Sequence, residues 1–386
     1  MNNRVVYMDY SATTYVKPEV LEEMLPYFTN KFGNPSAFYG VSRESRMAVD
    51  TARERVAKVL NADTNEIYFT GGGSEADNWA IKGIAFAHKN KGNHIITTKI
   101  EHHAVLHTCQ WLEKQGFEVT YLDVNEEGFV DLEELKNAIT DKTILVSVMF
   151  ANNEIGTIQP IGEVGKYLKG LKEKIYFHVD AIQSYGKINF RPSKYNIDFM
   201  SVSAHKFHGP KGIGFMYIKE NNRLKPMLTG GGQEIGIRSG TENVPGIYGL
   251  GEAVRILNKD LDAVISKVDN LKNILKNEII DNIEDIKINS PEDGVCHILN
   301  VSFRGTKGEV LLHYLEQKGI YVSTGSACSS KKKGSYVLNA IGLTNEEING
   351  TIRFSLSDMN TEEEMLEAVK VLKESICDLR SIMKRK

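Results

Sequence analysis

Two residues that could hold a cofactor, Asp180 and Lys206, lie 26 positions apart. Lys206 follows an apolar segment at residues 198–203, and a lysine amine in a polar pocket can form a Schiff base with an aldehyde. Asp180 ends the apolar segment before it, where a carboxylate can pair with the protonated ring nitrogen of pyridoxal phosphate. Taken singly, these residues would be a loop lysine and a turn-capping aspartate. As a pair separated by one predicted strand, they indicate a pyridoxal phosphate site.

A glycine-rich segment, Thr70–Ser74, lies between a predicted strand and a predicted helix. Its three glycines allow close approach of the backbone to a phosphate, and Ser74 is the expected N-cap of the helix and a hydroxyl donor. No Gly-Lys-Ser/Thr follows, so the segment is not a nucleotide-binding Walker loop. A plain tight turn remains the alternative.

Polar side chains follow two further apolar segments. His102 and His103 come after residues 93–98, where an imidazole can lie against a flat ring and handle protons near neutral pH. One of the two histidines is expected only at the surface. Asn153 follows residues 143–150 and can donate a hydrogen bond to a ring oxygen or a substrate carboxylate, with a simple turn asparagine as the alternative.

Cys328 lies in a loop of small residues, at about residues 323–334, and is followed by Lys331–Lys333. An exposed thiol in such a loop is a candidate nucleophile or sulfur carrier, and nearby lysines favour its thiolate form. The lysines could equally be solvated surface. The other cysteines are expected to be buried in apolar helices or strands: Cys109, Cys296 and Cys377.

Short apolar runs alternate with amphipathic segments through the first 250 residues, which predicts an α/β domain with a mostly parallel sheet. In such sheets, ligands bind at the carboxyl ends of the strands. The predicted strands are residues 66–70, 93–98, 117–122, 143–150, 175–179, 198–203 and 214–218. The predicted helices are residues 42–60, 74–90, 104–114, 132–139 and 163–172.

The pattern changes after about residue 251 and predicts a smaller α+β domain. A long helix over residues 254–283 leads into it. Its predicted strands are residues 298–303, 320–323 and 351–356, and its predicted helices are residues 309–318 and 361–384.

Composition excludes several classes of protein. With 41% hydrophobic and 25% charged residues, the 386-residue chain has the composition of a globular protein, and no apolar run is long enough to cross a membrane. A net charge of −3 argues against direct nucleic-acid binding. Four scattered cysteines predict neither a disulfide framework nor a metal site, and no signal-peptide pattern is present. A cytoplasmic location is expected.

Together these residues resemble the cysteine desulfurases, class V aminotransferase-like enzymes that use pyridoxal phosphate. The resemblance spans nearly the whole chain, and the Gly-Ser-Ala-Cys loop is similar to the nitrogen-fixation and iron–sulfur-assembly branch. The segments that carry it are Asn34–Ser36, Glu101-His102, Asn152–Gly156, His178–Asp180, Ser203–Lys206, Arg238–Asn243 and Gly325–Cys328. It implies the pyridoxal-phosphate transferase fold (fold type I). A large cofactor-binding domain would span 16–255, and a small domain with the cysteine loop would combine 1–15 with 256–386.

The resemblance also implies roles for individual residues. Lys206 would hold the cofactor covalently, Asp180 would pair with the ring nitrogen, Gln183 would contact the ring hydroxyl oxygen, and His102 would stack on the ring. The phosphate would be bound by Gly73, Ser74, Ser203 and His205, together with Thr241 from the other subunit of a homodimer. The carboxylate of L-cysteine would be held by Asn34, Asn153 and Arg353, of which Asn153 would also contact the cofactor. Arg353 could instead be a structural ion-pair residue.

The implied reaction transfers the sulfur of L-cysteine to Cys328 as a persulfide and releases L-alanine, with Lys206 and His102 as the other catalytic residues. The sulfur then passes to an acceptor protein such as an iron–sulfur scaffold. Tyr39 stands where the family pattern predicts histidine, and residues 331–336 depart from it too, which leaves the choice of acceptor open among nitrogenase maturation, housekeeping cluster assembly and tRNA thiolation. The alternatives are a selenocysteine lyase, an aminotransferase of the same fold, a non-catalytic scaffold and, more distantly, a nucleotide-binding enzyme.

Overall fold

The computed structural model describes residues 5–324 and 334–383. The predictions for Cys328 and for Lys331, Lys332 and Lys333 therefore lie outside the described residues. Within the described residues, no helix is both long enough and apolar enough to cross a membrane.

The larger part of the chain is built on a sheet of seven strands in the order β2-β8-β7-β6-β5-β3-β4. Every pairing is parallel except those of β8, which runs antiparallel to both of its neighbours. This confirms the prediction of an α/β fold with a mostly parallel sheet. The strands are β2 (Ile67–Thr70), β3 (His94–Thr98), β4 (Glu118–Leu122), β5 (Thr143–Ser147), β6 (Tyr176–Asp180), β7 (Phe199–Ser203) and β8 (Gly214–Ile218).

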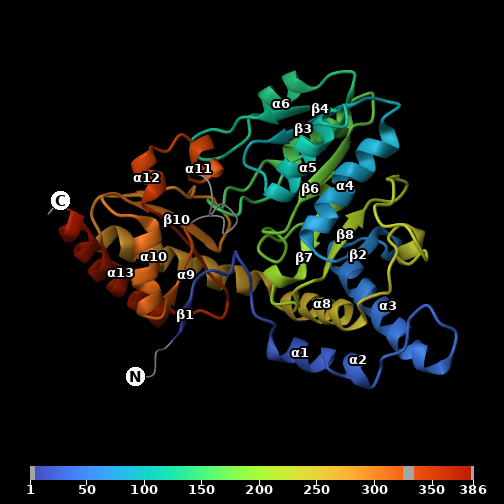
Figure 1. Ribbon diagram of the computed structural model, residues 1–386, viewed down its shortest axis with the longest axis horizontal. Coiled ribbons are helices and arrows are strands. Elements are labelled where there is room, and N and C mark those ends of the chain that lie inside the picture. The colour runs from blue at the N-terminus through green and yellow to red at the C-terminus, as the bar shows by residue number, and fades with distance from the viewer. Residues whose placement is uncertain (1–4, 325–333, 384–386) are drawn as a thin grey trace.

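Helices cover both faces of this sheet (Figure 1). Alternate residues of one strand enter different cores: Ile96 packs in the cluster with α3, α7 and α8, whereas Ile95 packs with α4 and α5. Burial on both faces explains why these strands are apolar nearly throughout. The helices are α3 (Gly40–Leu60), α4 (Gly73–His88), α5 (His103–Glu113), α6 (Leu132–Ala138), α7 (Ile161–Gly170) and α8 (Val244–Leu257).

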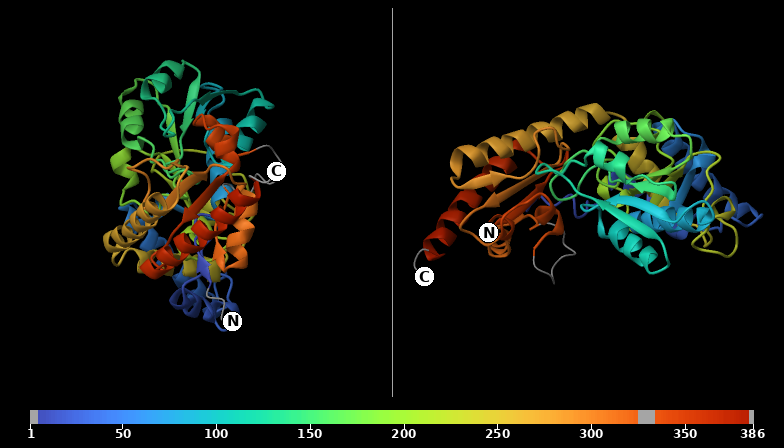
Figure 2. Two further views of the ribbon diagram at one scale, coloured as in Figure 1. Left: turned by 90° about the vertical axis from the view of Figure 1, so that its left-hand side faces the viewer. Right: turned by 90° about the horizontal axis from the view of Figure 1, so that it is seen from above.

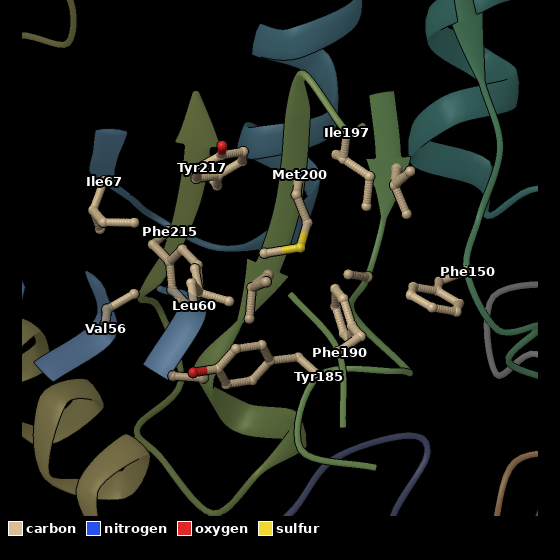
Figure 3. Packing of buried hydrophobic residues seen from close by; sticks show 14 of the residues in the cluster. Val56, Leu60, Ile67, Phe150, Tyr185, Phe190, Ile197, Met200, Phe215 and Tyr217 are labelled. Atoms are coloured by element: carbon tan, nitrogen blue, oxygen red, sulfur yellow. The ribbon is translucent and has the colours of Figure 1, made fainter. Parts of the chain in front are cut away.

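The first of these cores is drawn from close by in Figure 3. Val56 and Leu60 of α3 lie beside Phe215 of the sheet. Farther along, Phe150 and Phe190 meet edge to face, with ring centroids 4.6 Å apart. Aromatic side chains therefore extend the core toward the ends of the strands that carry the predicted site.

A second, three-stranded antiparallel sheet lies in the C-terminal part, in the order β12-β10-β9. The N-terminus joins this part, because β1 (Val6–Tyr7) pairs in parallel with β11 (Ile320–Tyr321), and Figures 1 and 2 show the two ends of the chain on the same side. The other elements are β9 (Ile286–Ile288), β10 (Ile298–Phe303), β12 (Thr351–Ser355), α9 (Leu261–Asn282), α10 (Gly308–Gln317) and α13 (Glu362–Met383).

The hydrophobic core of this part contains Val6, Met8 and residues from 268 to 379, whereas the two cores around the large sheet use residues from 20 to 254. The division into a domain of residues 16–255 and a domain that combines 1–15 with 256–386 stays a prediction. Shorter helices connect the elements: α1 (Pro18–Met24), α2 (Pro26–Thr29), α11 (Tyr336–Ala340) and α12 (Asn345–Asn349).

The predicted continuous helix over 254–283 is wrong. Two helices, α8 and α9, meet at residues 258–260, and α8 begins ten residues earlier, at Val244. The first ten of its fourteen residues were missed because glycines interrupt the apolar pattern. At Gly251 a Cβ atom would lie 2.7 Å from the Cα of Ala52, so the absence of a side chain allows α8 to pack directly on α3.

Candidate active site

A cavity of about 330 Å³ opens at the carboxyl ends of the parallel strands, where the sheet topology predicts a ligand site. Most of its walls come from the loops after β3, β5, β6 and β7, while Ser11 and Ala12 of the N-terminal segment and Arg353 of β12 close it. Its lining residues are Ser11, Ala12, Gly73, Ser74, His102, Met149, Ala151, Asn153, Asp180, Ile182, Gln183, Ser203, His205, Lys206 and Arg353. Ten of the residues proposed from the sequence, Gly73 among them, thus meet at one cavity.

Lys206 lies in a short 3-10 turn, Ala204–Lys206, directly after β7. Its Nζ donates hydrogen bonds to the carbonyl oxygens of Ser11 at 2.6 Å and Ala12 at 2.8 Å. The N-terminal segment therefore holds the amine at the cavity wall. Sequence analysis did not find this contact, because the partners are backbone atoms almost 200 residues away.

Asp180 is the last residue of β6 and is only 4% exposed. Its Oδ1 accepts a hydrogen bond from the backbone N–H of Ile182 at 2.9 Å. Burial raises the pKa of this carboxyl to about 6, although the bond to Ile182 and the nearby Lys206 oppose the rise. A buried carboxylate with so few donors around it is well suited to a cationic partner such as a protonated ring nitrogen.

His102 precedes α5 and caps it, because its Nδ1 accepts a hydrogen bond from the N–H of Ala104 at 3.1 Å. Burial, followed by the charge of Lys206, lowers the pKa of His102 to about 4. The imidazole is therefore neutral near pH 7, with its proton on Nε2. His103 does not line this cavity and packs edge to face on Tyr336 instead.

Asn153 and Arg353 adjoin at the cavity, and both are buried. Arg353 donates from one terminal nitrogen to the carbonyl oxygen of Asn153 and from the other to Asp9 Oδ1, both at 2.7 Å. The arginine is thus part of a structural ion pair, one of the two possibilities left open by the sequence. The side-chain oxygen of Asn153 is buried with no hydrogen-bond partner among the described residues, so it can still serve a ligand.

The predicted substrate residue Asn34 does not lie at this cavity. Its side chain is exposed, and its Oδ1 accepts a hydrogen bond from the N–H of Ser36 at 2.9 Å. Thr241 is also exposed on the single chain, whereas its predicted role is on a partner subunit. The roles of both residues stay predictions.

The predicted phosphate site is the N-terminus of α4. Ser74 is not its N-cap: the helix begins at Gly73, and Gly72 takes the cap position with φ 146°, a conformation open to glycine. At Gly73, a Cβ would lie 2.1 Å from Ile182 Cδ1, so this backbone can approach the cavity floor only without a side chain. Free N–H groups and the positive end of the helix dipole favour an anion here.

Hydroxyl, imidazole and amine groups surround the N-terminus of α4. Ser203 and His205 also face an adjoining cavity of about 530 Å³, where Thr13 and Lys211 join them. Thr13 Oγ1 and His205 Nδ1 lie 3.1 Å apart. Burial, followed by the charges of Lys206 and Lys211, lowers the pKa of His205 to about 4. Sequence analysis missed Thr13 and Lys211, although Lys211 stands five residues after Lys206.

Two buried acids near the cavity, Glu101 and Asp77, were given no role from the sequence, although Glu101 lies in a segment that carries the resemblance. Glu101 Oε1 accepts hydrogen bonds from Thr98 Oγ1 at 3.0 Å and from the N–H of Met149 at 2.8 Å, and burial raises its pKa to about 8. Asp77 lies 3.6 Å from Nε2 of the buried His178, and burial raises its pKa as well. In the sequence, these acids stand out only by position. Asp77 lies near the start of a predicted helix, and Glu101 follows a predicted apolar strand.

This donor set fits pyridoxal phosphate. An amine and a buried carboxylate meet at one cavity, a neutral imidazole flanks it, and a helix N-terminus with hydroxyl groups forms one end. The missing Cβ at Gly73 leaves the backbone open at that end. The chemistry of each wall therefore matches one part of the cofactor.

Comparison with known proteins agrees with this geometry. The model of the class-V aminotransferase family matches residues 6–367. Cysteine desulfurase IscS of Clostridium botulinum is 55% identical over 384 residues, which cover 98% of this chain and 96% of that protein. A solved NifS-like protein superposes with a TM-score of 0.91 at 41% identity, covering 96% of this chain and 99% of its own. A structure of SspA in complex with cysteine gives 0.83 at 37% identity, covering 92% and 100%.

The chain therefore belongs to the class-V aminotransferase family. Full-length identity of 55% places it, within that family, among the pyridoxal phosphate-dependent cysteine desulfurases. The family and fold predicted from the resemblance are confirmed.

Proposed function

We propose that this chain removes the sulfur of L-cysteine, releases L-alanine and carries the sulfur as a persulfide on Cys328. The observation that carries the proposal is the meeting of Lys206, Asp180 and the N-terminus of α4 at one cavity. A lysine, a strand-end carboxylate and an anion site are the three anchors that pyridoxal phosphate requires. The binding of cysteine by the related SspA supports the choice of substrate.

Each anchor has a proposed partner on the cofactor. Lys206 Nζ forms the covalent link, Asp180 pairs with the ring nitrogen, and Gln183 donates to the ring hydroxyl oxygen. Neutral His102 lies against the ring. Gly73, Ser74, Ser203 and His205 bind the phosphate, with Thr241 of a second subunit. The raised pKa of Asp180 supports its pairing, because a positive ring nitrogen compensates a carboxylate that is costly to bury.

Pyridoxal phosphate, once bound, supplies an electron sink for negative charge at the substrate α-carbon. Lys206 Nζ, displaced from its covalent link, moves the α-proton. The Cys328 thiolate then attacks the sulfur of the substrate, so that a sulfur–sulfur bond forms and the carbon–sulfur bond breaks. The electron pair of the broken bond stays with the carbon, which takes up protons and leaves as alanine. L-cysteine and a thiol thus become alanine and a persulfide with no external oxidant.

Substrate orientation is assigned to Arg353 and Asn153, with Asn34 as a further contact. One terminal nitrogen of Arg353 already donates a hydrogen bond to Asp9. Its Nε is buried without a partner among the described residues, and so is the side-chain oxygen of Asn153. These two unpaired atoms support a polar ligand at this wall, because buried polar groups are nearly always hydrogen-bonded.

A homodimer is the proposed assembly. Large apolar side chains are exposed along residues 28–47, and Phe38 is 98% exposed. Such a surface is unusual for a monomer and favours a protein partner. The other members of this surface are Phe28 at 59%, Phe32 at 69%, Tyr39 at 61%, Val41 at 53% and Met47 at 57% exposed.

The persulfide requires a protein acceptor, for which we propose an iron–sulfur scaffold, following the similarity of the Gly-Ser-Ala-Cys loop to that branch. Persulfide formation requires Cys328 as a free thiol. Reducing compartments keep thiols in that form, which supports a cytoplasmic location.

The test follows alanine, persulfide and the visible absorption of the purified protein with L-cysteine. Lys206→Ala should lose both turnover and the visible band. Cys328→Ser should keep the band and lose the persulfide. Cys377→Ser is the matched control and should keep both, because this thiol is exposed on α13 and was wrongly expected to be buried. A colourless wild-type protein, or sulfur transfer by Cys328→Ser, would contradict the proposal.

A further inference from the structure

The side-chain amide of Gln183 is held by two hydrogen bonds at the edge of the cavity. Its Nε2 donates to the carbonyl oxygen of Ser11 at 3.0 Å, and its Oε1 accepts from His297 Nε2 at 3.2 Å. A backbone carbonyl can only accept, so the Ser11 contact identifies the nitrogen side of the amide. The imidazole then holds the oxygen side. One N–H of Gln183 remains without an acceptor among the described residues, and Gln183 lines the cavity.

His297 belongs to a different part of the fold. It immediately precedes β10 and is 1% exposed, whereas Gln183 follows β6 of the large sheet. The backbone of His297 is itself anchored, because its carbonyl oxygen accepts a hydrogen bond from the N–H of Leu356 at 2.8 Å. His297 is not among the residues that line the cavity. Among the described residues, its side-chain hydrogen bond to Gln183 connects it to the site.

The ring of His297 can act only as a donor to Gln183. Burial lowers its pKa well below the ordinary value, and the positive charges of Lys187, Arg353, Lys272 and Lys206 act in the same direction. A neutral imidazole carries one proton. Since Nε2 faces an oxygen and Nδ1 has no partner among the described residues, that proton lies on Nε2.

We propose that His297 is a positioning residue that fixes the Gln183 amide, so that its remaining N–H is available to the ring hydroxyl oxygen of the cofactor. The proposal rests on the proposed binding of pyridoxal phosphate. Without the imidazole, Gln183 Oε1 becomes a buried acceptor with no donor, and the amide turns away from its place. The ring oxygen then loses a hydrogen bond that stabilises its negative charge.

The test is a pH titration of the visible band of the loaded enzyme. Loss of the donor destabilises the negative ring oxygen, so the midpoint of the spectral change should move to higher pH in His297→Phe. A hydrogen bond to a charged oxygen corresponds to a shift of about one to two pH units. His297→Asn retains a side-chain N–H and should return the midpoint toward the wild-type value. The matched control is His94→Phe, a buried histidine bonded to Thr143 and Thr120 instead, which should leave the midpoint unchanged.

The coupling to Gln183 is measured in a Gln183→Leu background, where His297→Phe should cause no further shift. An unchanged midpoint in His297→Phe, or an equal shift in both backgrounds, would overturn the proposal. If His297→Phe does not fold, His297→Leu takes its place with the same two criteria. A wild-type protein without a visible band would instead refute the proposed cofactor, so the two failures are distinguishable.

Discussion

Burial controls the protonation of the titratable groups around the cavity more than neighbouring charges do. Burial is the largest cause of the raised pKa of Glu101 and Asp180 and of the lowered pKa of His102 and His205. His102 and His205 are therefore neutral near pH 7 before a ligand binds. Charges on a bound cofactor would act strongly here, because few solvent molecules screen them among buried side chains.

Glu101 provides a test of this view. Its pKa rises from 4.5 to about 8 in the native state, so between these values the native protein holds a proton that the unfolded chain has lost. The stability that this proton gives the native state is fully present below pH 4.5. It falls progressively as the pH rises from 4.5 through 8. Glu101→Gln cannot ionise and lacks this dependence. Its free energy of unfolding, relative to wild type, should rise by roughly 3 kcal/mol between pH 5.5 and 7.5.

Urea unfolding of the cofactor-free protein at the two pH values measures this difference. Glu126→Gln is the control, because it makes the same substitution at a solvent-exposed glutamate. If the free energies of unfolding of Glu101→Gln and wild type differed by the same amount at both pH values, Glu101 would be ionised in the native state.

At the scale of elements, one buried ion pair ties the loop after β8 to the edge of the large sheet. Glu234 is 6% exposed and receives hydrogen bonds from both terminal nitrogens of Arg53, at 3.0 and 2.9 Å, and from the N–H of Phe69 at 2.8 Å. Arg53 also donates to the carbonyl oxygen of Ile67 in β2. Helix α3, strand β2 and the loop that continues to Thr241 therefore share one anchor.

Glu234→Ala should lower the free energy of unfolding by about 3–5 kcal/mol, because the Arg53 side chain, only 12% exposed, would lose its charged partner. Urea unfolding measures the loss. Glu133→Ala removes the exposed pair with Lys136 and should change stability little. Equal effects of the two substitutions would show that the buried pair contributes no more than a surface contact.

At the scale of the whole molecule, the N-terminal segment connects the two sheets at the site. β1 pairs with β11, Asp9 binds Arg353, and Ser11 and Ala12 accept the hydrogen bonds of Lys206. The cavity thus lies where the two parts of the chain meet, and its walls depend on their relative placement.

The exposed apolar surface along residues 28–47 makes the assembly testable. Phe32→Asp combined with Phe38→Asp should shift the protein from dimer to monomer in sedimentation velocity, because two charges would be buried in the interface. Leu366→Asp is the control: it alters an apolar residue of α13 that is 44% exposed, and the dimer should persist. A dimer that survives the double substitution would place the interface elsewhere.

Local patterns in the sequence identified the seven strands of the large sheet, its covering helices except α8, and the polar residues that follow the strands. This was possible because a strand buried on both faces needs a continuous apolar run, and parallel strands bring their carboxyl ends to one edge. Helix α8 escaped detection because its glycines serve contacts with α3 rather than a pattern within the helix. The N-cap of α4 was predicted two residues too late, at Ser74, because Gly72 takes that position with φ 146°, a conformation open to glycine.

Only the tertiary structure decided which distant groups meet at the cavity. Ser11 lies 195 residues from the lysine that it binds, and His297 lies 114 residues from Gln183. Such pairs leave no periodicity, because each partner fits its own local segment equally well without the other. The pKa values of Glu101 and Asp180 were likewise invisible in the sequence. Residue type sets only the reference value, whereas the shift arises from the solvent that the folded chain excludes.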